Sequence, residues 1–252
     1  MEITEEIRER RERVFLVLAG LFLCAMTMLN ILGITRFVQL GPMSLAIGVL
    51  PYPLTFLCTD LISELYGRAR ANFLVTVGLF LNGFIIATLW IANKVPSVAE
   101  QTQPPWQVIE LAEAIALPTG ASVEGSVELF TLIYATTSGA VLASMMAYLA
   151  AQYCDVYMFH FWKKLTKGKH LWLRNNGSTI VSQGVDSFMV ITVTFGAQFL
   201  AGAISASAML VLMAHNYLFK LCGALADTPL FYMGVYYLKR YLKITDSDLN
   251  AT

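Results

Sequence analysis

Long runs of apolar residues dominate the chain, and short polar segments separate them. The runs Val14 to Gly33, Phe37 to Thr59 and Ala71 to Asn93 contain no Asp, Glu, Lys or Arg. A helix needs roughly 20 predominantly apolar residues to cross the hydrocarbon of a bilayer. Each of these three runs therefore predicts a membrane-spanning helix.

Two further apolar stretches complete the pattern. Val127 to Trp162 predicts one long fourth span, with Asp155 near its end, and Ser178 to Leu238 is long enough for two spans joined near Gly202–Ser207. The first apolar run has no small-residue cleavage site typical of a signal peptide, so we expect it to remain as a span. The expected fold is an all-α, polytopic membrane protein with six transmembrane helices. Its predicted segments are a charged cytoplasmic N-terminal segment 1–13, one six-span domain 14–243 and a short polar C-terminal tail 244–252.

Basic residues alternate between the connecting segments and predict the orientation of the spans. Cytoplasmic loops carry an excess of Lys and Arg, so the basic segments belong on the cytoplasmic side and both termini face the cytoplasm. Arg36 and Lys94 are the few basic residues of the other connections. The basic segments contain Arg8, Arg10, Arg11 and Arg13; Arg68 and Arg70; Lys163, Lys164, Lys167, Lys169 and Arg174; and Lys239, Arg240 and Lys243.

The composition agrees with a membrane protein and excludes several other classes. Hydrophobic residues make up 57% of the chain and charged residues 13%, whereas a soluble domain averages about 25% charged residues. The formal net charge is zero, so we expect no nucleic-acid partner. The four cysteines have no CxxC spacing, so we expect neither a zinc site nor a disulfide framework, and we expect no cofactor.

Proline interrupts the second expected span. Pro51 and Pro53 flank Tyr52, and a proline inside a helix removes a backbone donor and clashes with the preceding turn. The pattern predicts a proline-broken second span with its break near the middle of the bilayer. Irregular backbone at that depth is tolerated only inside protein or beside a water-filled cavity.

Polar residues from several spans are expected at the same depth as this break. Asp186, Asp227 and Asn82 all fall near the middle of their spans. Each intramembrane carboxylate costs roughly 3 kcal/mol on insertion scales, so two of them favour a polar cavity over incidental placement. A mutually hydrogen-bonded structural network is the alternative.

A second polar cluster is expected near the cytoplasmic surface. Asp60 and Glu64 are four residues apart and share a helix face. This cluster is expected to be either a set of ordinary interfacial ion pairs or an inner gate. Its other members are Asp155, Arg174 and Asn176. Lys220 is grouped with them as a gate candidate, but it is expected deeper, on the outer half, where it could pair with an acidic neighbour that the sequence does not identify.

Two more features concern packing and the outer surface. Small residues recur every fourth position at Ala135, Gly139, Ala143, Ala147 and Ala151, which predicts a close helix contact either within the bundle or in a homodimer. The longest connection, 94–126, contains an amphipathic segment. We expect it to lie along the outer membrane surface as a structural loop or a lid.

Four segments resemble the queuosine precursor transporter family, also called the vitamin uptake transporter family. The resemblance runs from the first span to the last. Its segments are PYPLTFLCTDLISELYGRARA from Pro51, QYCDVYMFHFWKK from Gln152, KHLWLRNNGSTIVSQGVDSF from Lys169 and YLFKLCGALADTPLFY from Tyr217. The resemblance implies a multi-pass importer of the inner membrane. It also implies 7-deazaguanine substrates, namely 7-cyano-7-deazaguanine, 7-aminomethyl-7-deazaguanine or queuine, which feed queuosine modification of tRNA.

The residue types at the expected cavity agree with such a substrate. A carboxylate accepts the ring N–H and the exocyclic amine of a guanine-like edge, and an amide complements its carbonyl. Aromatic rings stack on a flat heterocycle. The candidate substrate-binding residues are Asp186, Asp227, Gln183, Asn82, Tyr52 and Phe56.

Two other functions compete with a self-contained importer. One is the substrate-binding membrane subunit of a larger uptake system, since the chain has no GxxxxGK[ST] phosphate-binding motif. The other is an intramembrane aspartyl protease, which would require Asp155 and Asp186 to face each other. The expectation is a transporter with no catalytic residues, whose partners are a small molecule and the lipid bilayer.

Overall fold

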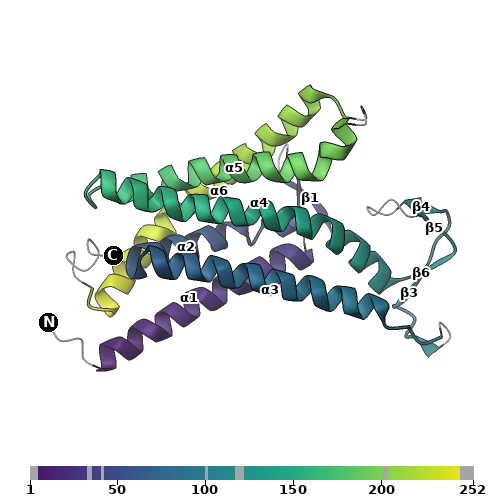
Figure 1. Cartoon of the computed structure of the whole chain (residues 1–252), viewed down its shortest axis with the longest axis horizontal. Helices are drawn as coiled ribbons and strands as arrows, with labels where there is room; N and C mark the ends of the chain where they lie inside the picture. Colours follow the sequence, from purple (N-terminus) through teal and green to yellow (C-terminus); the bar gives the residue numbers. More distant parts are fainter. Residues whose placement is uncertain are drawn as a thin grey trace.

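Long helices build almost the whole of the computed structural model of this chain (Figure 1). The structure describes residues 5–32, 36–40, 43–99, 102–116, 122–200, 202 and 204–244. The helices are α1 (Glu5–Leu32), η1 (Ile47–Val49), α2 (Tyr52–Tyr66), α3 (Arg68–Lys94), α4 (Leu129–Leu165), α5 (Leu171–Leu200) and α6 (Ala206–Tyr241). The strands are β1 (Phe37–Leu40), β2 (Met43–Ala46), β3 (Val108–Glu110), β4 (Ile115–Ala116), β5 (Ser122–Val123) and β6 (Ser126–Glu128).

The long helices are those of a membrane protein. Among the described residues, α1, α3 and α6 are both long enough and apolar enough to cross a bilayer. The helices α4 and α5 contain 37 and 30 residues, so at a rise of about 1.5 Å per residue they also exceed the thickness of the hydrocarbon core. The expected all-α membrane class is confirmed.

The second expected span is not one broken helix. The strands β1 and β2 pair as an antiparallel hairpin, with Phe37 opposite Ala46, and the short η1 turn follows. The helix α2 begins only at Tyr52, with Pro51 as its N-cap. Proline is well tolerated in the first helical turn, where its missing N–H has no partner to lose, so these prolines start a helix rather than kink one. The prediction of helix before Pro51 is therefore wrong.

The short helix α2 lies at the centre of the bundle. It packs against α1, α3, α4 and α6, and almost every residue from Thr55 to Leu65 is buried. At 15 residues it is about 22 Å long, which is less than the hydrocarbon thickness. Because four helices pack against it, the short helix α2 is surrounded by protein. Two of its buried residues, Asp60 and Glu64, are acidic.

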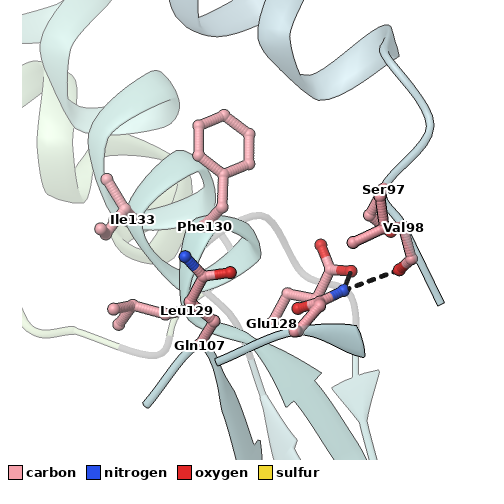
Figure 2. A pocket seen from close by; sticks show the side chains of 8 residues that line it. Ser97, Val98, Gln107, Glu128, Leu129, Phe130 and Ile133 are labelled. Atoms are coloured by element: carbon pink, nitrogen blue, oxygen red, sulfur yellow. Dashed lines mark hydrogen bonds between the residues drawn. The ribbon is translucent and has the colours of Figure 1, made fainter. Parts of the chain in front are cut away.

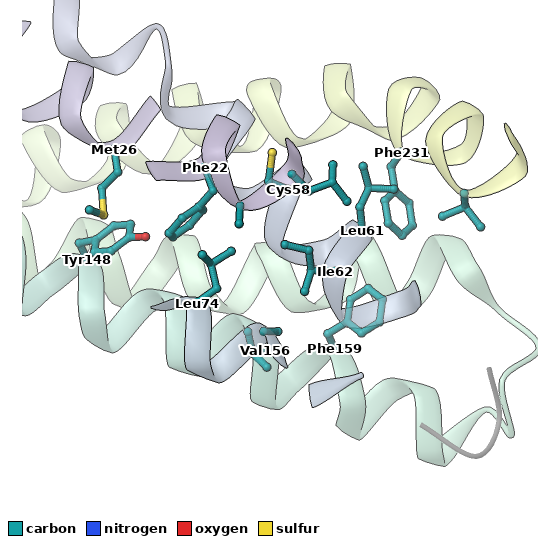
Figure 3. Close-up of a cluster of buried hydrophobic side chains, with 14 residues drawn as sticks. Phe22, Met26, Cys58, Leu61, Ile62, Leu74, Tyr148, Val156, Phe159 and Phe231 are labelled. Carbon is teal, nitrogen blue, oxygen red and sulfur yellow. The ribbon is translucent and has the colours of Figure 1, made fainter. Parts of the chain in front are cut away.

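The main apolar core forms around α2 (Figure 3). Phe22 and Met26 from α1 lie on one side of Ile62, and Phe159 from α4 meets Phe231 from α6 edge-on, with ring centroids 6.3 Å apart. Gly78 permits the close approach of α3 to α1, because a Cβ there would lie only 3.0 Å from Sδ of Met26. These contacts hold α1, α3, α4 and α6 against α2.

The basic segments come together at one end of the bundle. The two termini, the turn after α2 and the turn after α4 lie at this end (Figure 1). Gly67 makes the first turn with φ of 84°, and Lys167 and Gly168 make the second with φ of 50° and 77°. The strands β3 to β6 and the connection between α5 and α6 lie at the other end (Figure 1). This arrangement agrees with the alternation of charge in the sequence.

Small residues line a buried face of α4. Ala135, Ala147 and Ala151 are buried, and α4 packs along both α5 and α3. The side chains of residues 138–144, which include Gly139 and Ala143, lie outside the described part of the structure. The burial of Ala147 and Ala151 favours close packing inside the bundle.

Replacing Phe22 by alanine is expected to destabilise the protein by about 3 kcal/mol or more, because its side chain is completely buried in the core and its removal leaves a cavity. Phe80 is the matched control, since it is 73% exposed on the outside of α3 and its replacement leaves no cavity. Thermal unfolding of both variants in the same detergent measures the difference. Equal stability of the two variants would contradict the assigned core.

Candidate functional site

A buried polar stripe runs along α5. Asn175, Ser178, Ser182 and Asp186 follow one another every three or four residues, so they lie on one helix face. All four are buried, together with their neighbours Asn176, Thr179, Gln183 and Ser187. A polar face inside a bundle has to be satisfied by groups on other helices, because no water is available in the hydrocarbon. The stripe therefore identifies α5 as the helix that organises the polar interior.

The deepest contact of this stripe is an ion pair between Asp186 and Lys220. The ammonium of Lys220, on α6, donates to Oδ2 of Asp186, and both side chains are buried. The same ammonium lies 3.5 Å from the hydroxyl of Tyr52 and 4.5 Å from the centroid of its ring. Asp186 and Gln183 also lie within hydrogen-bonding reach of the Tyr52 hydroxyl. Lys220 thus compensates Asp186, which is the acidic partner that the sequence could not identify.

A small cavity opens beside this ion pair, between α2, α5 and α6. Its lining residues are Tyr52, Pro53 and Phe56 from α2, Thr179 and Gln183 from α5, and Phe219, Lys220, Gly223, Ala224 and Asp227 from α6. The structure therefore brings four of the predicted substrate-binding residues to one place, with Asp186 next to them. The free volume of about 20 Å³ holds roughly one water molecule, so this conformation is closed to a base-sized ligand.

Asn82 is the one predicted substrate-binding residue that lies elsewhere. It is buried between α3 and α1, where its Oδ1 accepts a hydrogen bond from Asn30. Its Nδ2 lies 3.5 Å from Sδ of Met26. This amide pair joins two helices on the far side of the apolar core, so Asn82 does not line the cavity in this structure.

The second predicted cluster is also buried, and it contains a second ion pair. Nη2 of Arg174 lies 3.0 Å from Oε1 of Glu64, and the two side chains are only 5% and 2% exposed. The guanidinium also lies over the ring of Phe159. Two residues after Arg174, the side chain of Asn176 accepts a hydrogen bond of 3.0 Å from Thr228 on α6. The ion pair between Arg174 and Glu64 is therefore enclosed by protein rather than exposed on the surface of the bundle.

Two carboxyl groups of this region meet without a cation. Asp60 on α2 faces Asp155 on α4, and both are buried. Oδ1 of Asp155 accepts a hydrogen bond of 2.8 Å from Ser182 on α5. Oδ1 of Asp60 and Oδ2 of Asp155 have no hydrogen-bond partner among the described residues. The aspartyl protease hypothesis required Asp155 to face Asp186, and the structure pairs each of them with another residue.

The sequence analysis missed the polar residues that connect these groups. Gln152 and Ser182 are completely buried, and Gln152 accepts a hydrogen bond of 3.3 Å from Thr59. Their signal was present in the helical spacing: Gln152 precedes Asp155 by three residues, and Ser182 precedes Asp186 by four. A search for polar residues on the same helix face as an intramembrane carboxylate would have found both.

The outer connection forms a pocket of its own between the ends of α3 and α4 (Figure 2). Nε2 of Gln103 donates to Glu128 at 2.8 Å and to the carbonyl of Val98 at 2.9 Å. Hydrogen bonds from Ser97 and Gln103 lower the pKa of the exposed Glu128 carboxyl. Phe130 and Ile133 supply an apolar wall (Figure 2). These contacts fasten the connection to the start of α4.

The structure shows no group of three or more His, Cys, Asp or Glu side chains able to hold a metal ion in the described ranges. The acidic residues of the interior instead meet Lys220, Arg174, a serine hydroxyl or one another.

Comparison with known proteins shows similarity to transporters. The family model described as "Putative vitamin uptake transporter" matches residues 46–234. The chain is also 27% identical over 205 residues to a protein of Bacillus subtilis (strain 168) named "Probable queuosine precursor transporter". The aligned region covers 80% of this chain and 76% of the relative. No solved structure matches the chain.

Replacing Lys220 by methionine is expected to destabilise the protein by about 3–5 kcal/mol, because Asp186 is left buried without its cation. The double variant Asp186→Leu/Lys220→Met should recover most of the loss, since it removes both charges. Thermal or denaturant unfolding in detergent of Lys220→Met, Asp186→Leu and the double variant gives the three values needed for a double-mutant cycle. Additive losses would show that the two side chains do not depend on each other.

Proposed function

The chain belongs to the vitamin uptake transporter family, and we propose that it imports queuosine precursors across the inner membrane. The proposed substrates are the 7-deazaguanine bases 7-cyano-7-deazaguanine, 7-aminomethyl-7-deazaguanine and queuine. The observation that carries this proposal is the cavity between α2, α5 and α6, where aromatic, amide and carboxyl side chains meet inside an apolar bundle. The relative from Bacillus subtilis, named as a queuosine precursor transporter, supports the substrate class.

The cavity offers the groups that a flat, polar base requires. The rings of Tyr52 and Phe56 lie next to each other with centroids 5.2 Å apart, so a base can stack on either of them. Asp227 forms no ion pair among the described residues, and its carboxyl is free to accept two N–H groups of a guanine-like edge. Gln183, whose Oε1 has no hydrogen-bond partner among the described residues, completes the polar side of the cavity.

Asp186 acts in this site together with Lys220. The ammonium holds the carboxylate in place beside Tyr52, and a ligand donor that approaches Asp186 competes with it. When Asp186 releases Lys220 and binds a ligand donor instead, the contact between α5 and α6 changes. The ion pair thus links binding of the base to the relative position of these two helices.

The closed cavity requires a conformational change before a base can enter. We propose that Glu64 and Arg174 form the inner gate, because their ion pair joins α2 to α5 near the basic end of the bundle. Six crossings with both termini in the cytoplasm agree with the position of the basic segments. In this arrangement the second crossing is formed by β1, β2 and η1 together with α2.

A self-contained importer is preferred over the substrate-binding subunit of a larger system. The site is complete within one chain, and both ion pairs are internal. Transport by the purified chain in liposomes, without any other protein, distinguishes the two possibilities.

The purified protein is expected to bind at least one of the three bases, and Phe56→Ala and Asp227→Asn are each expected to weaken binding roughly 5- to 150-fold. Loss of a stacking ring or of a buried acceptor costs about 1–3 kcal/mol. Equilibrium binding of a radiolabelled base in detergent gives the dissociation constants. Glu110→Gln, an exposed acid-to-amide change on β3, is the control. If the wild-type protein binds none of the bases, the proposed substrate class is wrong.

The orientation is tested with reporter proteins fused at two positions. A fusion after Thr252 is expected to be active only with a cytoplasmic reporter, and an insertion at Trp106, an exposed residue of the outer connection, only with a periplasmic one. The reason is that the basic segments lie at the end of the bundle that contains the termini. A periplasmic signal from the C-terminal fusion would rule out the six-span arrangement.

A further inference from the structure

The carboxyl groups of Asp60 and Asp155 take part in neither ion pair. Three cations of the described residues are buried: Arg174 binds Glu64, Lys220 binds Asp186, and Lys163 lies within the electrostatic reach of Glu64. The charged groups that act most strongly on Asp60 are acidic, namely Asp155 on α4, Asp227 on α6 and Glu64 on its own helix. Two negative charges in contact inside a bundle repel each other strongly, so one of them must be neutralised.

The hydrogen bonds of this pair point to the same conclusion. Oδ1 of Asp60 and Oδ2 of Asp155 are buried and have no donor among the described residues. Two ionised carboxylates only accept hydrogen bonds, so their contact becomes a hydrogen bond only when one of them carries a proton. The proton on one carboxyl group then donates to the other, and the buried oxygens become satisfied.

A third unpartnered group lies beside the pair. Gln152 is completely buried one helical turn before Asp155, and its Nε2 has no partner among the described residues. Its other amide atom is held by Thr59, the residue before Asp60. Side-chain atoms without a hydrogen-bond partner among the described residues thus lie on both α2 and α4, where the two carboxyl groups meet. Natural interiors leave few such groups unsatisfied without a functional reason.

We propose that Asp60 and Asp155 form a proton-binding site, and that the proton they share is the ion whose gradient drives uptake. The coupling part of this inference rests on the proposed import function. A proton needs only the two facing carboxyl groups, whereas a metal ion needs a shell of several oxygen ligands. One of the four carboxyl oxygens is already engaged by the hydroxyl of Ser182 at 2.8 Å.

The pair is connected to the substrate cavity through α5 and α6. Ser182, which donates to Asp155, is followed directly by Gln183, which lines the cavity. Asp227 lines the same cavity and lies within the electrostatic reach of Asp60. Each cycle binds one proton and one base on the outer side and releases both on the inner side. The pair carries a charge of −1 when loaded and −2 when empty, so loading removes a repulsion between α2 and α4.

Transport by the full-length protein in liposomes tests the coupling. With an acidic exterior and the membrane potential held at zero, the wild-type protein is expected to accumulate a radiolabelled 7-deazaguanine base. A difference of one pH unit supports up to about tenfold accumulation for one proton per base. Asp60→Asn and Asp155→Asn should abolish accumulation and retain exchange of internal for external base. Glu110→Gln should behave as the wild type. Accumulation by both Asn variants, or accumulation driven by sodium alone, overturns the proposal.

A measurement without substrate separates this proposal from the import function. Infrared spectroscopy of the purified wild-type protein at neutral pH is expected to show the carbonyl band of a buried, protonated carboxylic acid. The band should be missing in Asp60→Asn and Asp155→Asn and present in Asp227→Asn. Its absence from the folded wild-type protein overturns the proton site. Its presence in a protein that binds none of the bases supports the proton site and rejects the proposed import function.

Discussion

Compensation of buried charge is the constraint on which this structure depends. An uncompensated charge inside a bundle surrounded by lipid is far more expensive than the burial of any apolar side chain is favourable. Helix α5 meets this constraint twice, through Arg174 toward α2 and through Asp186 toward α6. The relative positions of these three helices are therefore fixed by charge, and the apolar core around Phe22 and Ile62 adds α1, α3 and α4 to the same framework.

The polar interior divides into parts with different chemistry. Around Tyr52 and Lys220 a cation is present, and aromatic rings lie next to a small cavity. Around Asp60 and Asp155 the surrounding charges are acidic, and the available hydrogen bonds are incomplete. The first environment is suited to a flat ligand, and the second is suited to a proton. Their connection through the consecutive residues Ser182 and Gln183 brings the two within one helical turn of each other on α5.

The sequence predicted the class of the fold and most of the candidate site, because both depend on local patterns. Apolar runs and basic segments identified the long helices, and the depth of Asp186, Asp227 and the segment around Tyr52 identified residues that meet at one cavity. The partner of Lys220 and the contact between Asp60 and Asp155 depend on how helices far apart in the chain are rotated, which no local pattern contains. The hairpin before Pro51 was missed for a different reason. A run of apolar residues has the same composition whether it forms a helix or a strand, and its periodicity alone does not separate the two.

The ion pair between Asp186 and Lys220 also bears on how the protein is made. During insertion from the ribosome, α5 alone would bring Asp186 into the hydrocarbon, and α6 alone would bring Lys220, at a cost of roughly 3 kcal/mol for each charge. Only a short connection separates the two helices in the chain, and they pack side by side. Leaving the translocation channel together as a paired hairpin would let each charge neutralise the other before either meets lipid. The contact that positions the transport site would then act first as a requirement for biogenesis.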